Sequence, residues 1–557
     1  MKNFKQFFFA LLPIVAVMAF SACKDDNPPT PTQDDIIEVC GTVTDQDGNA
    51  LAGATVSSGT ANATTDADGK YCINVNKAGA LTFSLADYES QTEFVNSQTS
   101  INTSLVSSAS EETTYIESTV EKECDDGATV DVIQVGVTDR GKGTGTMTWT
   151  NGKVWILEGL VFVNDGQVLT IEPGTIIKGG TGQGEKATAL VVAQGGRLIA
   201  EGTADMPIVF TSEADAIARD AEGNLCLGSS LASSVRGLWG GVILLGKATL
   251  NAATETRAIE GIPSTEPRGT YGGTDDADNS GSLKYISIRH GGTDIGAGNE
   301  INGLTMGAVG SGTTIDYIEV FANKDDGYEW FGGTVNTKHL VSAYCGDDAF
   351  DYDEGWSGKN QFWLAYQEGA GDRGGEHDGG PSDCETCEPF ALPVMYNASF
   401  RGQGSTAGKR ALTFRDNAGG EYHNSIFWSY GRGVDIEVRA SIDDSYTQFQ
   451  NGNLKFTNNI LFDIAGNYFT IGNEDSGDVS AEQAALDAYF NDAANNLQVV
   501  DPQLGSDLAP MAGGPAAQAG ATPPNDGFFE EVSYHGAFAP GVATWISGWT
   551  AISKELN

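Results

Sequence analysis

The residues best suited to chemistry in this chain are carboxylates that recur at a fixed spacing. Segments 323–333 and 345–355 align at an offset of 22 residues, and the alignment pairs acids with acids. The pairs are Asp325 with Asp347, Asp326 with Asp348, and Glu329 with Asp351. Oxygen-rich clusters bind calcium, and paired carboxylates can also act as acid and base. The pattern therefore predicts a cation site or an acid–base site, provided that the fold brings the pairs together.

A parallel β-solenoid would bring the pairs together. The strand residues that precede the acids also align, Ile318 with Leu340 and then with Phe362, and 22 residues is the length of one coil. Stacked coils lie about 4.8 Å apart. Two carboxylates at that separation repel by roughly 3 kcal/mol at an effective dielectric constant of 20. We therefore expect this acidic ladder to be solvated, to share protons or to be bridged by a cation.

Three interpretations of the acidic ladder are open: a calcium site, a solvated corner, and the catalytic centre of a polysaccharide lyase or glycoside hydrolase. The calcium ligands would be Asp325, Asp326, Glu329, Asp347, Asp348 and Asp351, with the carbonyls of Gly327 or Gly346 in addition. The catalytic acids would be Asp347, Asp348 and Asp351, with Lys338, His339, Arg373 or His377 nearby. No established lyase or hydrolase motif occurs, and a fold alone does not indicate an activity, so binding is favoured over catalysis.

The segment 157–212 shows how the coils are built, with short β-branched strands that glycines interrupt every few residues. Strands this short bury a core only when coils stack. The strings EPGTIIKG, AQGGRLIAEGT and PIVFTS resemble right-handed parallel β-helix proteins of bacterial surfaces. That resemblance implies a right-handed parallel β-helix over 146–525, with Asn at corners such as Asn458. Residues 526–557, which contain Trp545 and Trp549, are expected to cap its open end.

A smaller all-β domain precedes the solenoid. Between residues 36 and 106, short β-rich runs alternate with turn signals, which is typical of a β-sandwich. The strings GTVTDQDGNALAGATV and TTDADGKYCINV resemble the carboxypeptidase regulatory-like domain, which implies a spacer or a glycan-binding module without catalytic residues. Cys40 and Cys72 lie in two of its expected strands and are the predicted disulfide. Residues 107–145 are expected to connect the two domains.

The N-terminus has the features of a lipoprotein export signal. Lys2 and Lys5 precede an apolar run that is too short to span a bilayer, and Ser21 and Ala22 precede Cys23. The sequence around Cys23 resembles the signal of Bacteroidota lipoproteins that reach the outer leaflet. We therefore expect a signal peptide at 1–22, lipidation of Cys23, a tether at 23–35, and an outer-membrane protein that faces the cell exterior.

Composition limits the classes of partner. The 557-residue chain carries a formal charge of −44, which argues against nucleic acid because phosphate binding depends on Lys and Arg. The expected partners are the membrane, through the lipid anchor, and a glycan or another surface protein. Seven cysteines remain after Cys23, so at least one thiol is unpaired. The five histidines lack ligand spacing and are expected at coil corners or in solvent.

Overall fold

The computed structural model describes residues 36–45, 48–77, 79–86, 88, 90–95, 98–105, 112–182, 184–263, 265–296, 299–440, 442–473 and 477–556. The predicted signal peptide, Cys23 and the tether lie outside the described residues. The chain divides into two compact units, Met1–Ser110 and Glu111–Asn557, which we describe separately.

The first unit is a small β-sandwich. One sheet has the order β4-β1-β7 and the other has the order β3-β2-β5-β6. Their strands are β1 (Ile36–Asp45), β2 (Thr55–Ser58), β3 (Ala61–Thr64), β4 (Lys70–Asn76), β5 (Ala80–Ser84), β6 (Gln91–Phe94) and β7 (Thr103–Leu105). Alternate residues of β4 point inward, so Tyr71, Ile73 and Val75 are buried in the core. Cys40 and Cys72 are register partners in β1 and β4 and form a disulfide.

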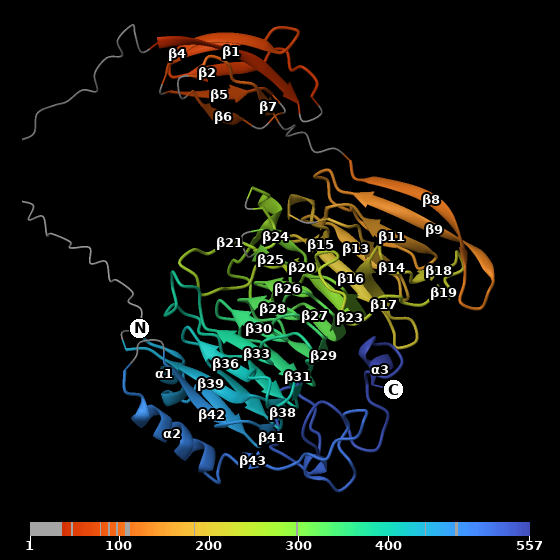
Figure 1. Ribbon diagram of the computed structural model, residues 1–557, viewed down its shortest axis with the longest axis vertical. Coiled ribbons are helices and arrows are strands. Elements are labelled where there is room, and N and C mark those ends of the chain that lie inside the picture. Colours follow the sequence, from red (N-terminus) through yellow and green to blue (C-terminus); the bar gives the residue numbers. More distant parts are fainter. Residues whose placement is uncertain are drawn as a thin grey trace, which may run out of the picture. The chain divides into compact units, whose positions relative to one another are not determined.

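The second unit is a parallel β-helix, as the coloured succession of stacked strands shows (Figure 1). Each coil contributes one strand to a ten-stranded sheet, in which neighbouring strands run parallel. The strands are β12 (Leu160–Val163), β15 (Ala189–Val192), β20 (Val242–Leu245), β26 (Leu304–Gly307), β28 (Tyr328–Phe331), β30 (Phe350–Asp353), β33 (Gly375–Asp378), β36 (Arg410–Arg415), β39 (Arg432–Val438) and β42 (Phe469–Asn473). The predicted all-β class, a sandwich followed by a parallel β-helix, is confirmed.

A larger sheet of twenty strands forms the rest of each coil. Its parallel strands are β10 (Met147–Trp149), β11 (Lys153–Leu157), β13 (Val168–Ile171), β14 (Ile176–Gly179), β16 (Arg197–Glu201), β17 (Ile208–Ser212), β23 (Gly281–Arg289), β27 (Thr314–Phe321), β29 (Thr337–Ala343), β31 (Lys359–Gln361), β32 (Leu364–Tyr366), β34 (Val394–Tyr396), β35 (Ser399–Arg401), β37 (Gly420–His423), β38 (Ile426–Tyr430), β40 (Leu454–Thr457), β41 (Ile460–Ile464) and β43 (Gln498–Val499). Two-stranded ribbons in the loops are β18 (Ala218–Arg219) with β19 (Leu225–Leu227), β21 (Arg257–Ala258) with β22 (Thr270–Tyr271), and β24 (Asp294–Gly296) with β25 (Asn299–Glu300).

The expected connector is in part a structural element of the β-helix. Strands β8 (Thr114–Glu123) and β9 (Thr129–Thr138) form an antiparallel hairpin, and β9 pairs in parallel with β11. Cys124 at the end of this hairpin is bonded to Cys226 in β19. The hairpin thus pairs with the edge of the first coils, which would otherwise expose unpaired backbone groups.

The solenoid interior is packed with aromatic rings. Trp330 has no exposed surface, and its ring stacks on Trp356 and Trp363 at centroid distances of 4.5 and 5.1 Å. Residues on both sides of each inward ring point outward, because successive side chains of a strand alternate between faces. Because Trp330 points into the interior, the neighbouring Glu329 lies on the outer face of the sheet.

From β23 onward, one corner of each coil carries a residue with a positive φ. From one coil to the next this position is occupied by Tyr285, Tyr317, His339, Phe362, Asn397, Asn424 and Asn458. The aromatic members stack outside the sheet, with 4.4 Å between Tyr285 and Tyr317 and 4.0 Å between Tyr317 and His339. Asn adopts this conformation more readily than other residues that have a Cβ, which explains the Asn corners of the later coils.

The C-terminal segment covers this aromatic column. Trp545 contacts the rings of Tyr317 and His339, and Trp549 contacts Tyr285. The prediction that residues 526–557 cap the open end is wrong about location, because the segment lies along the side of the twenty-stranded sheet (Figure 1). The stacked rings of the corner provide the apolar surface that the segment buries.

Helices are few in the β-helix unit. They are α1 (Ser445–Gln450), α2 (Ser480–Asn491) and α3 (Ile552–Glu555). Helix α2 packs over the last coil, where Leu486 is fully buried and the Tyr489 hydroxyl contacts the backbone of Phe456 (Figure 1). Among the described residues, no helix is long and apolar enough to cross a bilayer.

Candidate functional site

The acidic ladder lies on the outer face of the ten-stranded sheet and at the turn that precedes it. Glu329 is the register partner of Asp351, as the 22-residue offset predicts. The Asp326 carboxylate accepts a hydrogen bond of 2.8 Å from the backbone N–H of Asp348 in the next coil. The structure therefore brings the predicted pairs together along one edge of the solenoid.

A third coil extends the ladder. Asp351 pairs with Glu376, and the Asp348 carboxylate accepts a hydrogen bond from the backbone N–H of Arg373. Sequence reasoning missed Asp372 and Glu376 because this coil contains three additional residues. The signal was present, since GDRGGEHDGG at 371–380 aligns with GDDAFDYDEG at 346–355 once the offset is 25 residues.

Three groups of carboxylates place their oxygens within 4.8 Å of one another. They are Asp325 with Asp326 and Asp347, Asp326 with Glu329 and Asp351, and Asp347 with Asp348 and Asp372. All six predicted calcium ligands thus belong to at least one group. Asp326, Glu329 and Asp348 are almost completely buried, with 8%, 9% and 1% of their surface exposed.

Burial and mutual repulsion raise the pKa values of these acids. Loss of solvent is the largest cause for Asp326, Glu329, Asp348 and Asp351, and neighbouring carboxylates add to it, so each pKa lies well above its usual range. In the adjacent outward column, burial together with Asp378 and Glu354 raises the pKa of Asp353 to about 8. Without a cation these groups retain protons that free carboxylic acids would lose.

Two arginines and Lys409, which forms an ion pair with Asp372, neutralise only part of the ladder. Arg373 forms ion pairs with Asp348, Asp372 and Glu376. Arg415 pairs with Asp378 and Glu376. Among the described residues, no Lys, Arg or His forms an ion pair with Asp326, Glu329 or Asp351.

The unneutralised group, Asp326, Glu329 and Asp351, also contains polar atoms without partners. The Oδ1 atom of Asp351 is buried and has no hydrogen-bond partner. Asn302, which donates to Glu329, leaves its own Oδ1 without a partner while only 1% of its surface is exposed. Carboxylate oxygens that converge with few donors to satisfy them, as those of Asp326, Glu329 and Asp351 do, form a ligand set that suits calcium.

The expected glycine ligands are less well placed. The Gly327 carbonyl accepts a hydrogen bond from Leu304, and the Gly346 carbonyl accepts one from Gly371. Gly346 is required for close packing instead, because a Cβ there would lie 2.0 Å from the carbonyl oxygen of Lys324.

Of the four predicted basic residues, only Arg373 reaches the acids. Lys338 and His339 lie on β29 of the other sheet, where they contact Glu530 and Asp316. His377 is buried between the rings of Tyr352 and Tyr422, and burial lowers its pKa to about 3. All five histidines are buried, so none faces solvent as one of the two expected locations required. The other expected location, a coil corner, is confirmed for His339.

The family models that match this chain agree with the two domains that the structure shows. Residues 141–550 match the model described as the pectate-lyase like beta helix domain, which covers most of the chain. The chain belongs to this pectate-lyase-like β-helix family. Residues 39–120 match the CarboxypepD_reg-like domain. No curated protein and no solved structure matches the chain significantly.

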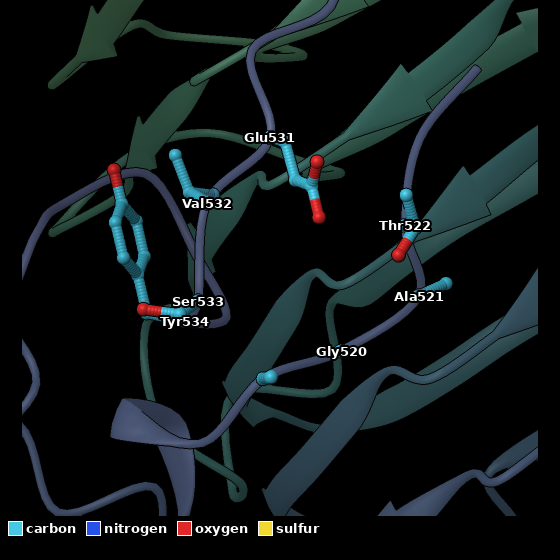
Figure 2. A pocket seen from close by; sticks show the side chains of 8 residues that line it. Gly520, Ala521, Thr522, Glu531, Val532, Ser533 and Tyr534 are labelled. Atoms are coloured by element: carbon cyan, nitrogen blue, oxygen red, sulfur yellow. The ribbon is translucent and has the colours of Figure 1, made fainter. Parts of the chain in front are cut away.

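Membership of the pectate-lyase-like β-helix family indicates a carbohydrate-related role. A second surface feature of this family member is a hollow of about 470 Å³ in the C-terminal segment. Gly520, Ala521 and Thr522 border it on one side and Glu531 to Tyr534 on the other (Figure 2). It lies over the Asn corners of the twenty-stranded sheet, since Asn424 donates to the carbonyl of Ala521, and no residue of the acidic ladder lines it.

Proposed function

We propose that this protein is a lipid-anchored binding protein of the bacterial cell surface, and that its β-helix binds a carbohydrate at the acidic ladder. Calcium held by Asp326, Glu329 and Asp351 would form the centre of the site. The observation that supports this proposal is that the carboxylates of Asp326, Glu329 and Asp351 converge and, within the described part of the chain, form no ion pair with a cationic side chain. Asp326 and Glu329 are buried and Asp351 is half-buried. Hydroxyl and carboxylate groups of a sugar would complete the coordination of the ion.

Binding is favoured over cleavage by a lyase because, among the described residues, each basic side chain at the ladder is paired with carboxylates or enclosed in the core; Lys409 is paired with Asp372. A lyase requires a basic group that can accept a proton from the substrate. Ion pairs with carboxylates raise the pKa values of Arg373 and Arg415, so both guanidinium groups hold their protons more firmly. His377 is enclosed in the core.

The carbohydrate proposal is tested on a glycan array with chelator-treated protein, with and without added calcium. We expect binding to appear only with calcium and to be lost in Asp351→Asn. The alternative, a lyase or glycoside hydrolase, would release reducing ends or unsaturated products from the bound glycan. Binding that depends neither on calcium nor on the Asp351 carboxylate would contradict the proposed site.

The anchor is supported by the short apolar N-terminal run and the small residues before Cys23. A clickable palmitate analogue should label the wild-type protein in cells, and Cys23→Ala should abolish the label. Protease added to intact cells should digest the protein if it faces outward. Protection from protease until lysis would contradict the outward orientation.

A further inference from the structure

A second polar pocket, of about 280 Å³, lies on the outer face of the twenty-stranded sheet near its first coils. Strands β8, β9, β11 and β14 contribute Lys122, Gln134, Val154 and Lys178 to its lining. The segment that follows β17 contributes Glu213, Ala214, Asp215, Ala216 and, at the start of β18, Ala218. The Cys124–Cys226 disulfide joins this loop to the β8–β9 hairpin, so the pocket walls are covalently linked.

Lys178 is the central residue of the pocket. It occupies the outward register position between Ile156 and Thr211, and the loop covers it until only 6% of its surface is exposed. Its ammonium group donates to the backbone carbonyl of Asp215. Among the described residues, no carboxylate forms an ion pair with it, although burying an unpaired charge is unfavourable.

The carboxylate of Asp215 already has hydrogen-bond partners of its own. The Asp215 carboxylate accepts hydrogen bonds from Thr211, Ser229 and Ser230, at 3.1, 2.8 and 2.8 Å. Burial lowers the pKa of Lys178, and the positive charge of Lys122 lowers it further while Asp215 and Glu213 oppose this effect. Lys178 and Lys122 thus face the pocket together with two carboxylates. Of these, Asp215 is held by its own hydrogen bonds and Glu213 is exposed to solvent.

We propose that this pocket binds a small oxyanion, the carboxylate or sulfate of a sugar or the same group as a free ion, between Lys178 and Lys122. The Gln134 side chain lies in the same lining and offers a neutral donor. An anion there neutralises the buried ammonium that the fold leaves unpaired. This site lies on a different sheet from the acidic ladder and does not depend on the function proposed above.

The test is isothermal titration calorimetry of the full chain downstream of Cys23 with galacturonate, sodium sulfate and neutral galactose. We expect galacturonate or sulfate to bind and galactose not to bind. Lys122→Gln should weaken the interaction at least tenfold, and Lys178→Met should abolish it. Lys153→Gln is the matched control, because Lys153 lies on the neighbouring strand β11 but is paired with Glu117.

The outcomes separate the possible sources of the anion. Binding of galacturonate with little response to sulfate identifies a sugar acid, and the reverse identifies a free inorganic anion. If Lys178→Met does not fold, the Lys122→Gln titration still decides the question, since Lys122 is only partly buried. Equal affinity in the wild type and Lys122→Gln, or no binding of either anion, would overturn the proposal and leave Lys178 as a support for the loop.

Discussion

Asp351 is the residue on which the cation site depends most directly. It contacts the ladder in both directions, pairing with Glu329 in one coil and Glu376 in the next. We expect Asp351→Asn to weaken calcium binding by about tenfold or more, equivalent to about 1.4 kcal/mol, because the ion loses a charged ligand. Titration of chelator-treated protein with calcium in a calorimeter measures this change. Asp205→Asn, an exposed substitution outside the ladder, should leave the affinity unchanged.

Protonation of the ladder makes stability depend on pH. The pKa values of the ladder acids Asp326, Glu329, Asp348 and Asp351 lie well above their usual range, and those of Asp353 and Asp378 in the adjacent column are raised to about 8 and about 6. In calcium-free protein the folded state therefore binds more protons than the unfolded chain between about pH 4 and 8. Stability must therefore fall as the pH rises through this range. Urea unfolding at pH 5 and pH 8 should show a lower midpoint at pH 8.

Calcium should reverse that trend, because it binds the deprotonated carboxylates. Addition of calcium at pH 8 should raise the urea midpoint, whereas at pH 5 its effect should be small. Asp353→Asn should flatten the pH dependence of the chelated protein. A chelated protein that is more stable at pH 8 than at pH 5 would show that the ladder is not proton-bearing.

At the scale of elements, docking of the C-terminal segment depends on Glu319 of β27. This carboxylate is fully buried and accepts hydrogen bonds from the backbone N–H groups of Ala551 and Ile552, at 2.8 and 2.9 Å. Glu319→Ala leaves these donors unpaired and should destabilise the docked segment by about 1–3 kcal/mol.

Limited proteolysis followed by mass spectrometry measures this effect. Cleavage within 526–556 should be faster in Glu319→Ala than in the wild type. Glu530→Gln is a suitable control, because the exposed Glu530 side chain forms an ion pair with Lys338, while the backbone hydrogen bonds between Glu530 and Gln361 are kept. Equal cleavage rates in the wild type and Glu319→Ala would show that the aromatic contacts alone hold the segment.

The strand pattern and the repeat predicted the solenoid and the pairing of Glu329 with Asp351, because coil length fixes register. The contribution of Glu376 was missed because extra residues in a loop shift the offset without shifting the strand. The site of the C-terminal segment could not be predicted either. Trp545 and Trp549 indicate burial, but only the folded corner shows that Tyr317 and His339 are the surface they bury.

At the scale of the molecule, the Cys124–Cys226 disulfide constrains the largest loop. It joins residues 102 positions apart, whereas Cys384 and Cys387 are only 3 apart. In the chain-entropy model, closing a loop of about 100 residues stabilises a protein by about 4–5 kcal/mol. We expect Cys124→Ser/Cys226→Ser to lower the free energy of unfolding by that order.

Denaturant unfolding of the oxidised variants checks this expectation. Cys384→Ser/Cys387→Ser is the matched control and should have a much smaller effect, since it releases a very short loop. Similar losses in both double variants would show that loop entropy is not the main contribution. Cys345 is buried and forms no disulfide, so its thiol is the same in both double variants.

The position of Glu319 has a consequence for the order of folding. Its partners Ala551 and Ile552 lie more than 230 residues further along the chain. During synthesis, which begins at the N-terminus, the chain can form its coils one after another. The aromatic column of the corner stays exposed until the C-terminal tryptophans have been synthesised. A product truncated near residue 500 would therefore form its coils but leave this apolar surface exposed to solvent. The exposed apolar surface would make the product a substrate of quality-control proteases.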